Sequence, residues 1–186
     1  MERAGLNPSV LDPERLLKKA GLTVGMNVGD FGTGGAAYFG LQAARMIGEK
    51  ARLFAVDVFK PALSAAMGKA RLAGLRNIVP VWSNLEVFNA TAAVADQSLD
   101  FGMLINVLHQ AERPEAVLHE CTRMMKVGGK LLVVEWRQSF PGFGPKRDKI
   151  MSRDTVEKLA GRFGLVQRHT FEPGDYHWAM VFERVR

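Results

Sequence analysis

The chain has 186 residues, of which 47% are hydrophobic and 24% charged, a length and composition typical of one globular domain with its own core. No apolar run reaches the roughly 18–20 residues of a membrane span, and the N-terminal segment lacks the apolar core of a signal peptide. We therefore expect a cytoplasmic protein with no membrane span. The single cysteine, Cys121, excludes an intrachain disulfide and a cysteine-based metal centre.

Basic residues outnumber acidic ones, with 25 Lys and Arg against 19 Asp and Glu, which gives a formal net charge of +6. Part of this excess lies in segment 137–153, where Asp148 is the lone acidic residue. A basic balance permits a nucleic-acid or other anionic partner, but it does not identify one, because most charge runs are solvated surface.

The first predicted element is a helix over 13–20, because Asp12 is a suitable N-cap, Pro13 fits the first helical position and Gly21 suits the C-terminal end. Downstream, short apolar runs alternate with helical patterns that end near glycines. In chain order the predicted strands are 27–31, 52–57, 78–81, 99–106, 130–135, 165–171 and 178–184, and the remaining helices are 36–47, 61–73, 85–95, 113–125 and 152–163.

Strands that alternate with helices predict an α/β fold with a mostly parallel sheet covered by helices on both faces. The end of the chain differs, because the last two predicted strands flank the turn Pro173-Gly174-Asp175 and leave no room for a crossover helix. They must form an antiparallel hairpin. No repeat or linker divides the chain, so we expect a single domain over 1–186.

The stretch VGDFGTGGAA, residues 28–37, places a glycine-rich loop between a predicted strand and a predicted helix. Such a loop presents backbone N–H groups to a nucleotide, and Asp57, at the end of the next strand, suits ribose hydroxyls. The spacing of the glycines alone is equally consistent with a dinucleotide-binding loop. Asp30 favours a ligand with a positive group, such as S-adenosylmethionine, because a carboxylate ahead of the loop repels a pyrophosphate. Alternatively, Asp30 only orders the glycine loop.

Further motifs follow in order after VGDFGTG: the acidic Asp57, VWSNLEVF, LDFGMLINVLHQ and RMMKVGGKLLVVEW, which spans a helix, a Gly-Gly turn and a strand. Together these motifs resemble the class I S-adenosylmethionine-dependent methyltransferases, over nearly the whole chain. The likeness implies a Rossmann-like fold with a seven-stranded, mostly parallel sheet and a C-terminal antiparallel hairpin. The segments NVLHQ, MMKVGGKLLVVEW and Gly144-Pro145-Lys146-Arg147 are most similar to the small branch related to ubiquinone/menaquinone C-methyltransferases.

The resemblance assigns roles to particular residues. Asp30 and the loop Gly32, Thr33 and Gly34 are expected to hold the methionine part of the cofactor. Asp57 is expected at the ribose, and Asn84 with Leu85 at the adenine. Val58, next to Asp57, is expected as a further cofactor-binding residue. Asn106 is expected to face the reacting centre, since open α/β sheets bind ligands at the carboxyl ends of their strands. The segment 1–21 is expected to cover this site with its helix.

Methyl transfer needs alignment of the acceptor, and it needs a base only when the acceptor loses a proton. His109 is the candidate base, because it follows the fourth predicted strand and imidazole titrates near neutral pH. Its alternative role is to shape the pocket. Trp136 and Arg137 are candidate acceptor contacts, with core packing the alternative for Trp136. No spacing of His, Asp and Glu suggests a metal site.

The sequence is compatible with three functional hypotheses. The first is a methyltransferase that acts on a small molecule. The second is an RNA or protein methyltransferase, which the net charge of +6 motivates. The third is a non-catalytic module that binds the cofactor, motivated by Ala36 in place of a common third glycine and by Asn84 in place of a common Asp.

Overall fold

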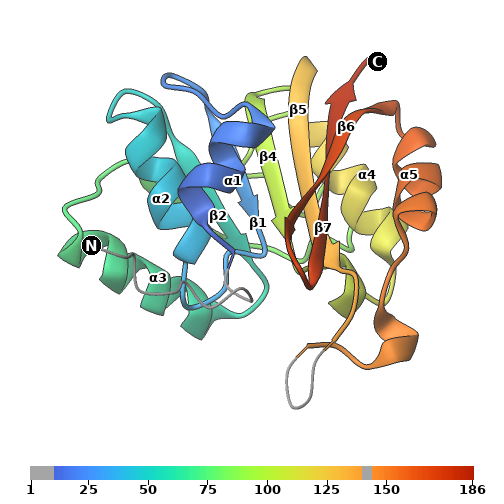
Figure 1. Cartoon of the computed structure of the whole chain (residues 1–186). Coiled ribbons are helices and arrows are strands. Elements are labelled where there is room, and N and C mark those ends of the chain that lie inside the picture. Colours follow the sequence, from blue (N-terminus) through green and yellow to red (C-terminus); the bar gives the residue numbers. More distant parts are fainter. Residues whose placement is uncertain (1–10, 140–143) are drawn as a thin grey trace.

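The computed structural model describes residues 11–139 and 144–186, and these ranges contain one seven-stranded sheet in the order β3-β2-β1-β4-β5-β7-β6 (Figure 1). The strands are β1 (Val28–Phe31), β2 (Leu53–Asp57), β3 (Ile78–Trp82), β4 (Leu99–Ile105), β5 (Met125–Trp136), β6 (Leu165–Gly174) and β7 (His177–Arg184). The α-helices are α1 (Pro13–Ala20), α2 (Tyr38–Ile47), α3 (Lys60–Leu72), α4 (Pro114–Met124) and α5 (Arg153–Gly161), and the short 3₁₀ turns are η1 (Leu108–Gln110) and η2 (Arg147–Lys149).

Strands β1 to β5 run parallel, and β7 lies antiparallel between β5 and β6. The predicted C-terminal hairpin is therefore confirmed, as is the mostly parallel α/β sheet. Sequence order reverses between β1 and β4, because the chain first proceeds outward to β3 and then returns to pair on the other side of β1. Such a switch point leaves a crevice beyond the carboxyl ends of the two central strands.

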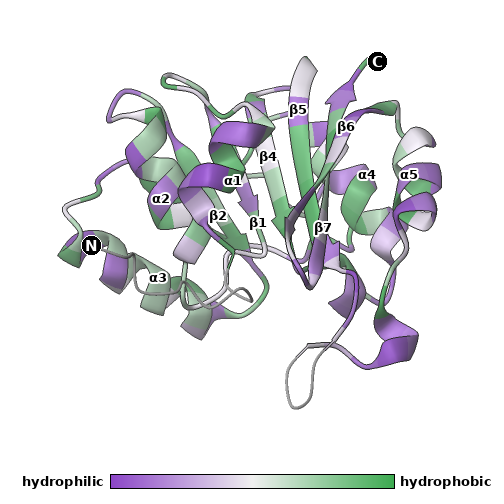
Figure 2. Cartoon of the chain, viewed as in Figure 1, coloured by the Kyte–Doolittle hydropathy of each residue, from purple (hydrophilic) through white to green (hydrophobic). Residues whose placement is uncertain are grey.

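Each face of the sheet has its own hydrophobic core. Successive side chains of a strand point to opposite faces, so the same strands contribute to both cores. On β5, Leu132 and Val134 pack beneath α1, α2 and α3, whereas Leu131 and Val133 pack beneath α4 and α5. Figure 2 shows the result, with hydrophobic strands at the centre and helices that are hydrophilic on their outer surfaces. Because the central strands are buried on both faces, their sequences are nearly continuous apolar runs.

The predicted helix over 85–95 is wrong, because this stretch forms a chain of turns that reaches β4 without a helix. Two of its backbone N–H groups have a partner outside the segment: Asn89 and Thr91 donate to the Glu120 carboxylate on α4, at 2.8 and 3.0 Å. Glu120 is fully buried and also accepts from Arg123. Tertiary hydrogen bonds thus replace the i→i−4 bonds that the pattern predicted.

The predicted turn at Gly128-Gly129 lies within β5, which begins at Met125. The pairing of β4 with β5 shifts register there, from Leu99 opposite Met125 to Phe101 opposite Lys130. The glycines therefore sit in an irregular part of the strand. Within residues 11–139 and 144–186, no helix is long and apolar enough to cross a membrane.

Candidate active site

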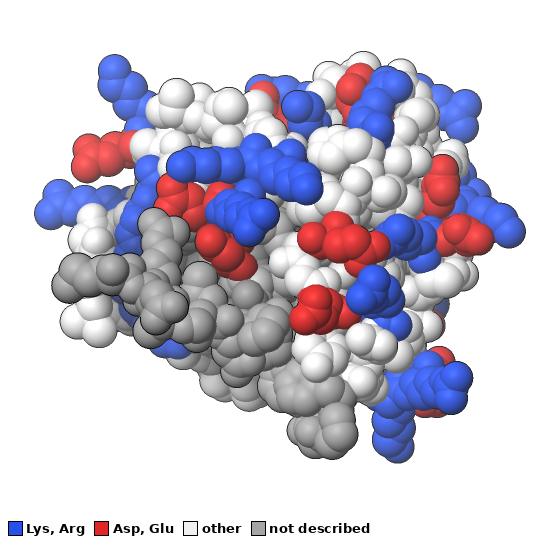
Figure 3. Space-filling view, in the orientation of Figure 1, with Lys and Arg blue, Asp and Glu red and all other residues white. Residues whose placement is uncertain are grey.

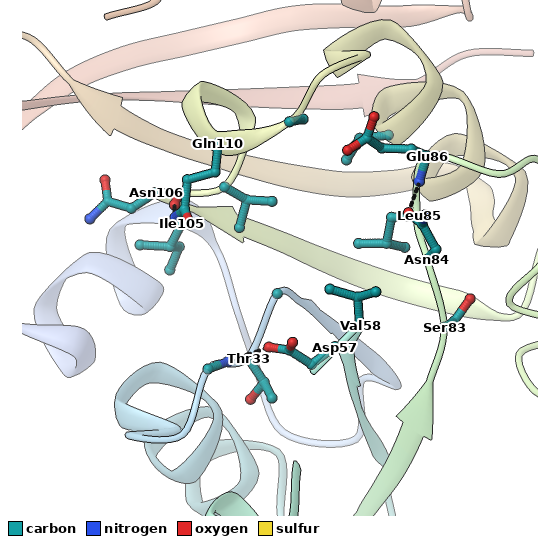
Figure 4. A pocket seen from close by; sticks show the side chains of 15 residues that line it. Thr33, Asp57, Val58, Ser83, Asn84, Leu85, Glu86, Ile105, Asn106 and Gln110 are labelled. Carbon is teal, nitrogen blue, oxygen red and sulfur yellow. Dashed lines mark hydrogen bonds between the residues drawn. The ribbon is translucent and has the colours of Figure 1, made fainter. Parts of the chain in front are cut away.

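A cavity of about 530 Å³ lies beyond the carboxyl ends of β1, β2, β3 and β4, at the switch point of the sheet (Figure 4). Strand register brings these ends together, because Phe31 of β1 pairs with both Val56 of β2 and Leu104 of β4. Of the predicted cofactor residues, all except Asp30 line this cavity. The lining residues are Gly32, Thr33, Gly34, Asp57, Val58, Ser83, Asn84, Leu85, Glu86, Ile105, Asn106, Val107, Gln110, Ala111 and Val117.

The glycine loop after β1 has a backbone conformation that favours glycine over residues with side chains. Gly32 and Gly34 have φ of +83° and +61°, a region that L side chains rarely adopt. At Gly32 there is also no room, because a Cβ would lie 2.6 Å from the Cγ2 of Val107 on the β4 side of the cavity. The loop and the segment after β4 are therefore in direct contact across the floor of the site.

Asp57 fixes this loop from the end of β2. Its Oδ2 accepts the N–H of Gly34 at 2.9 Å, and its Oδ1 accepts the N–H of Phe59 at 2.9 Å. Each carboxylate oxygen can accept more than one hydrogen bond, so both keep capacity for a ligand. A carboxylate with this remaining capacity, facing a cavity beside a glycine loop, can accept from the two hydroxyls of a ribose.

Asp30 lies beneath the loop rather than in the cavity lining, and it is 5% exposed. Its Oδ2 accepts from the hydroxyl of Thr33 at 2.5 Å, and a Cβ on Gly40 of α2 would come within 2.5 Å of the same oxygen. Burial raises the pKa of Asp30 from 3.8 to about 7, against the lowering effect of the Thr33 hydrogen bond and with a further rise from the charge of Asp57. These contacts match the alternative in which Asp30 orders the loop.

The charge of the cavity lining discriminates between ligands better than Asp30 does. Among the described lining residues, Asp57 and Glu86 are acidic and no Lys or Arg is present. A pyrophosphate placed here would face carboxylates with no described cation in the lining to offset them. A nucleoside that carries a positive group fits this lining.

Asn84, expected at the adenine, forms a local turn after β3. Its Oδ1 accepts the N–H of Glu86 at 2.9 Å, the bond drawn in Figure 4, and its side-chain amide keeps two N–H donors. Glu86 in turn accepts the N–H of Arg113 at 2.8 Å, just before α4 begins. The rim of the cavity is therefore tied to the helix that follows β4.

Asn106 directly follows β4 with φ of +58°, and its backbone N–H donates to the carbonyl of Val134 at 2.8 Å. Its side chain points away from the centre of the cavity in Figure 4. The Nδ2 group lies 3.3 Å from Nε2 of His177, while Oδ1 is the buried side-chain polar atom that has no partner among the described residues. Asn106 thus joins the cavity to a second group of side chains.

That second group is built on the ends of β4, β5 and β7, and it holds the candidate base. His109 lies in η1, and its Nδ1 is 2.8 Å from the Oε2 of Glu135, the penultimate residue of β5. The His109 ring is outside the cavity lining, although its neighbour Gln110 is part of it. Sequence reasoning missed Glu135, and the signal available was an acidic residue at the end of an apolar strand.

Trp136 and His177 complete this group, with their ring centroids 4.2 Å apart. Both are buried, at 6% and 3% exposure. Burial lowers the pKa of His177 to about 4, opposed by the charge of Glu135 and assisted by that of His109, so its ring is neutral at neutral pH. The structure places His177 between Asn106 and Trp136.

Arg137 lies apart from both groups. Its guanidinium pairs with Glu172 at 3.1 Å and donates to the carbonyl of Asp175 at 2.7 Å, both on the hairpin of β6 and β7. Arg153 pairs with the same Glu172. Part of the basic excess of segment 137–153 is therefore neutralised locally. Figure 3 shows basic and acidic side chains interspersed over the face in view.

Residues 1–10, which belong to the segment expected to cover the site, lie outside the described residues. Helix α1 packs against α2, and it contributes no residue to the described lining of the cavity. Within 11–139 and 144–186, no group of three or more His, Cys, Asp or Glu side chains is arranged to hold a metal ion.

Comparison with known proteins agrees with this fold. A family model described as a methyltransferase domain matches residues 29–133, more than half of the chain, which therefore belongs to the methyltransferase domain family. A SAM-dependent methyltransferase from Aquifex aeolicus shares 27% identity, with a TM-score of 0.85 over 94% of this chain and 90% of that one. No curated protein matches the chain.

Two more distant structures share the fold alone. A geranyl diphosphate C-methyltransferase from Streptomyces coelicolor, solved with S-adenosyl-L-homocysteine, has 13% identity and a TM-score of 0.75, over 93% of this chain and 77% of that one. The [4+2]-cyclase SpnF has 14% identity and a TM-score of 0.76, over 92% and 79%. The cyclase illustrates that a fold by itself does not fix the reaction.

The predicted family, fold, enzyme class and cofactor are thus confirmed: the chain is a methyltransferase that uses S-adenosylmethionine. The nature of the acceptor, the closer likeness to quinone C-methyltransferases, the cytoplasmic location and the roles of individual residues stay predictions.

Proposed function

We propose that this methyltransferase acts on a small-molecule acceptor, which binds over the ends of β4, β5 and β7, beside the cofactor cavity. The observation that carries this proposal is the compact group formed by Asn106, His109, Glu135, Trp136 and His177. It combines two closely packed, buried aromatic rings with a few hydrogen-bonding groups around the partly exposed His109, as small-molecule sites do.

The cofactor cavity supports the same proposal from the other side. S-adenosylmethionine, when bound, supplies a methyl group that is already activated by a sulfonium. The cavity of about 530 Å³ lies within the size range of small-ligand sites, and its described lining is acidic. In our proposal Asp57 accepts from the ribose, Asn84 and Leu85 contact the adenine, and Gly32 to Gly34 contact the methionine part.

The described residues have distinct tasks in this scheme. Gly32 and Gly34 keep the floor of the cavity free of side chains, which lets the backbone approach the ligand closely. Asp57 positions both the loop and the ribose. Buried Trp136 and His177 exclude water from the acceptor side, which protects the reacting groups and fixes their orientation.

An RNA acceptor receives no comparable support. Basic side chains are interspersed with acidic ones on the face in Figure 3, and Arg137 and Arg153 share Glu172 as a partner. Nucleic-acid binding depends on many phosphate contacts and weakens steeply with salt. A mixed surface of this kind provides few of them.

The test uses the purified chain and radiolabelled S-adenosylmethionine. Transfer of the label to members of a panel of hydroxylated, amino and carbon-acid small molecules is measured beside transfer to total RNA and to a protein extract. Labelled small-molecule product, formed at the same rate in low and moderate salt, supports the proposal. Transfer to RNA or protein alone contradicts it. Asp57→Asn provides the matched control, because it weakens cofactor binding and must lower any genuine transfer.

A further inference from the structure

We propose that Glu135 is a positioning residue that holds His109 as a general base, so that this enzyme methylates acceptors that enter the site with their proton. Hydroxyls, amines and acidic C–H groups belong to this class, whereas thioethers do not. The inference rests on the proposed function, since it concerns the acceptor side of the same site.

Glu135 is built into the end of β5 with no exposed side-chain surface. Its Oε2 lies 2.8 Å from Nδ1 of His109 and accepts the N–H of Trp136 at 3.3 Å, and its Oε1 accepts the N–H of His109 at 3.3 Å. Among the described residues no Lys or Arg pairs with this carboxylate. Burial of a carboxylate is costly without a partner, and here the imidazole is the side-chain partner.

This arrangement selects one tautomer of His109. An ionised carboxylate can only accept hydrogen bonds, so the Nδ1 of His109 must carry a proton to bond with it. Nε2 then holds the lone pair. No described residue bonds to Nε2, and 11% of the His109 side chain is exposed. The free lone pair is thus available to a proton on a bound acceptor, and the carboxylate stabilises the imidazolium that results.

The second histidine of the group cannot take this role. His177 is 3% exposed, its pKa is lowered to about 4, and its Nε2 is within 3.3 Å of the Asn106 amide. Its ring therefore stays neutral and packs against Trp136. The titratable groups packed together at this edge are thus Glu135 on β5, His109 on η1 and His177 on β7, of which His109 alone has both a carboxylate partner and an open nitrogen.

The proposed step balances without any further reagent. The acceptor's bond to hydrogen breaks toward Nε2 of His109, which gains the proton. The electron pair left on the acceptor forms the new bond to the methyl carbon, and the pair of the former carbon–sulfur bond stays on sulfur. His109 becomes an imidazolium that Glu135 holds through Nδ1–H, and it returns the proton to water after the products leave.

The tautomer can be measured without knowledge of the acceptor. In protein labelled with ¹⁵N-histidine and bound to S-adenosylhomocysteine, long-range proton–nitrogen correlations at about pH 8.5, where free imidazole is neutral, identify which ring nitrogen carries the proton. We expect His109 to be protonated at Nδ1 and bare at Nε2, with its signals assigned by His109→Gln. In Glu135→Gln the preference is lost, while the exposed His169 keeps its spectrum. A wild-type His109 protonated at Nε2 overturns the inference, even if no Glu135 variant folds.

A kinetic arm uses whichever acceptor the transfer screen identifies. Glu135→Gln should lower kcat by about 100-fold or more, as expected for loss of an oriented base, with KM for S-adenosylmethionine changed less than about twofold. Glu183→Gln, a carboxylate-to-amide change at a half-buried β7 position where Glu183 pairs with Arg168 away from the site, is the matched control and should leave kcat unchanged. A fall in kcat with the wild-type tautomer retained contradicts the positioning role.

Failure of the proposed function gives a different pattern. If the label passes to RNA or protein only, the small-molecule acceptor is wrong, but the tautomer of His109 and the kcat effect of Glu135→Gln are still measured on that acceptor. If a small molecule is methylated with full kcat in both His109→Gln and Glu135→Gln, the acceptor class stands and the base assignment falls.

Discussion

Replacement of Asp30 by Asn should make the protein more stable at neutral and alkaline pH, and the gain should depend on pH in a defined way. Asp30 is buried beneath the glycine loop, and burial raises its pKa from 3.8 to about 7. Asparagine has nearly the same shape and can still accept the hydroxyl of Thr33 through its carbonyl oxygen. The substitution thus removes the ionisation of this group while it keeps the hydrogen bond.

The sign follows from proton linkage. Between pH 3.8 and 7 the folded chain keeps a proton on Asp30 that the unfolded chain has released, so a rise in pH favours the unfolded state. Each unit of pKa difference corresponds to about 1.4 kcal/mol. Integrated from pH 5 to pH 8, the wild type should lose about 3 kcal/mol of unfolding free energy through this one group. Asp30→Asn should not show that loss.

The assay is urea unfolding of both proteins at half-unit steps from pH 5 to pH 8, without cofactor. The quantity of interest is the difference in unfolding free energy between variant and wild type, because other titrating groups cancel in it. We expect this difference to grow by about 3 kcal/mol toward pH 8 and to level off above pH 7. Asp148→Asn, an exposed carboxylate in η2, is the control and should give a flat difference. Parallel curves for Asp30→Asn and wild type would refute the reasoning.

Three further outcomes follow from the same geometry. Asp57→Asn should weaken S-adenosylhomocysteine binding about 10- to 100-fold by calorimetry, because the ribose loses a charged acceptor, and an unchanged Kd contradicts this role. Gly32→Ala should destabilise the chain by more than Gly34→Ala in urea unfolding, because both have positive φ but only Gly32 has Val107 in the way. Glu120→Gln should cost about 3 kcal/mol of unfolding free energy near neutral pH, because it leaves Arg123 with a weakened buried partner. Hydrogen bonds from Arg123 and from backbone N–H groups lower the pKa of Glu120 to about 2 despite its burial, so the wild-type advantage should fade as pH drops from 4.5 toward 2.

The sequence by itself determined the order of the strands and of five helices, the C-terminal hairpin, and the presence of a cavity beyond the carboxyl ends of the central strands. Local rules are sufficient for these features. Asp12, Pro13 and Gly21 delimit α1 through capping and backbone conformation, and the predicted helix ends where they indicate. Once β1 and β4 are known to be parallel neighbours, the loops at their carboxyl ends must meet, which brings Gly32 and Asn106 to one cavity.

Other features depended on contacts between residues far apart in the chain. The stretch 85–95 has a helical pattern, but Glu120, some 30 positions later, captures the N–H groups of Asn89 and Thr91. The sequence predicted that Asp30 lies at the ligand because its charge suits one, but the fold buries Asp30 beneath the loop and this burial raises its pKa. The capture of these N–H groups by Glu120 and the burial of Asp30 both depend on tertiary packing.

The pairing of His109 with Glu135 shows the same limit most clearly. The two residues are 26 positions apart, His109 in η1 after β4 and Glu135 near the end of β5. The one local signal for Glu135 is its place at the end of an apolar strand, and this does not indicate a histidine partner. Parallel pairing of β4 with β5 brings them within 2.8 Å, and burial gives that contact its chemical consequence. The sequence thus identified the cofactor and one histidine, whereas only the tertiary structure gave that histidine its carboxylate partner.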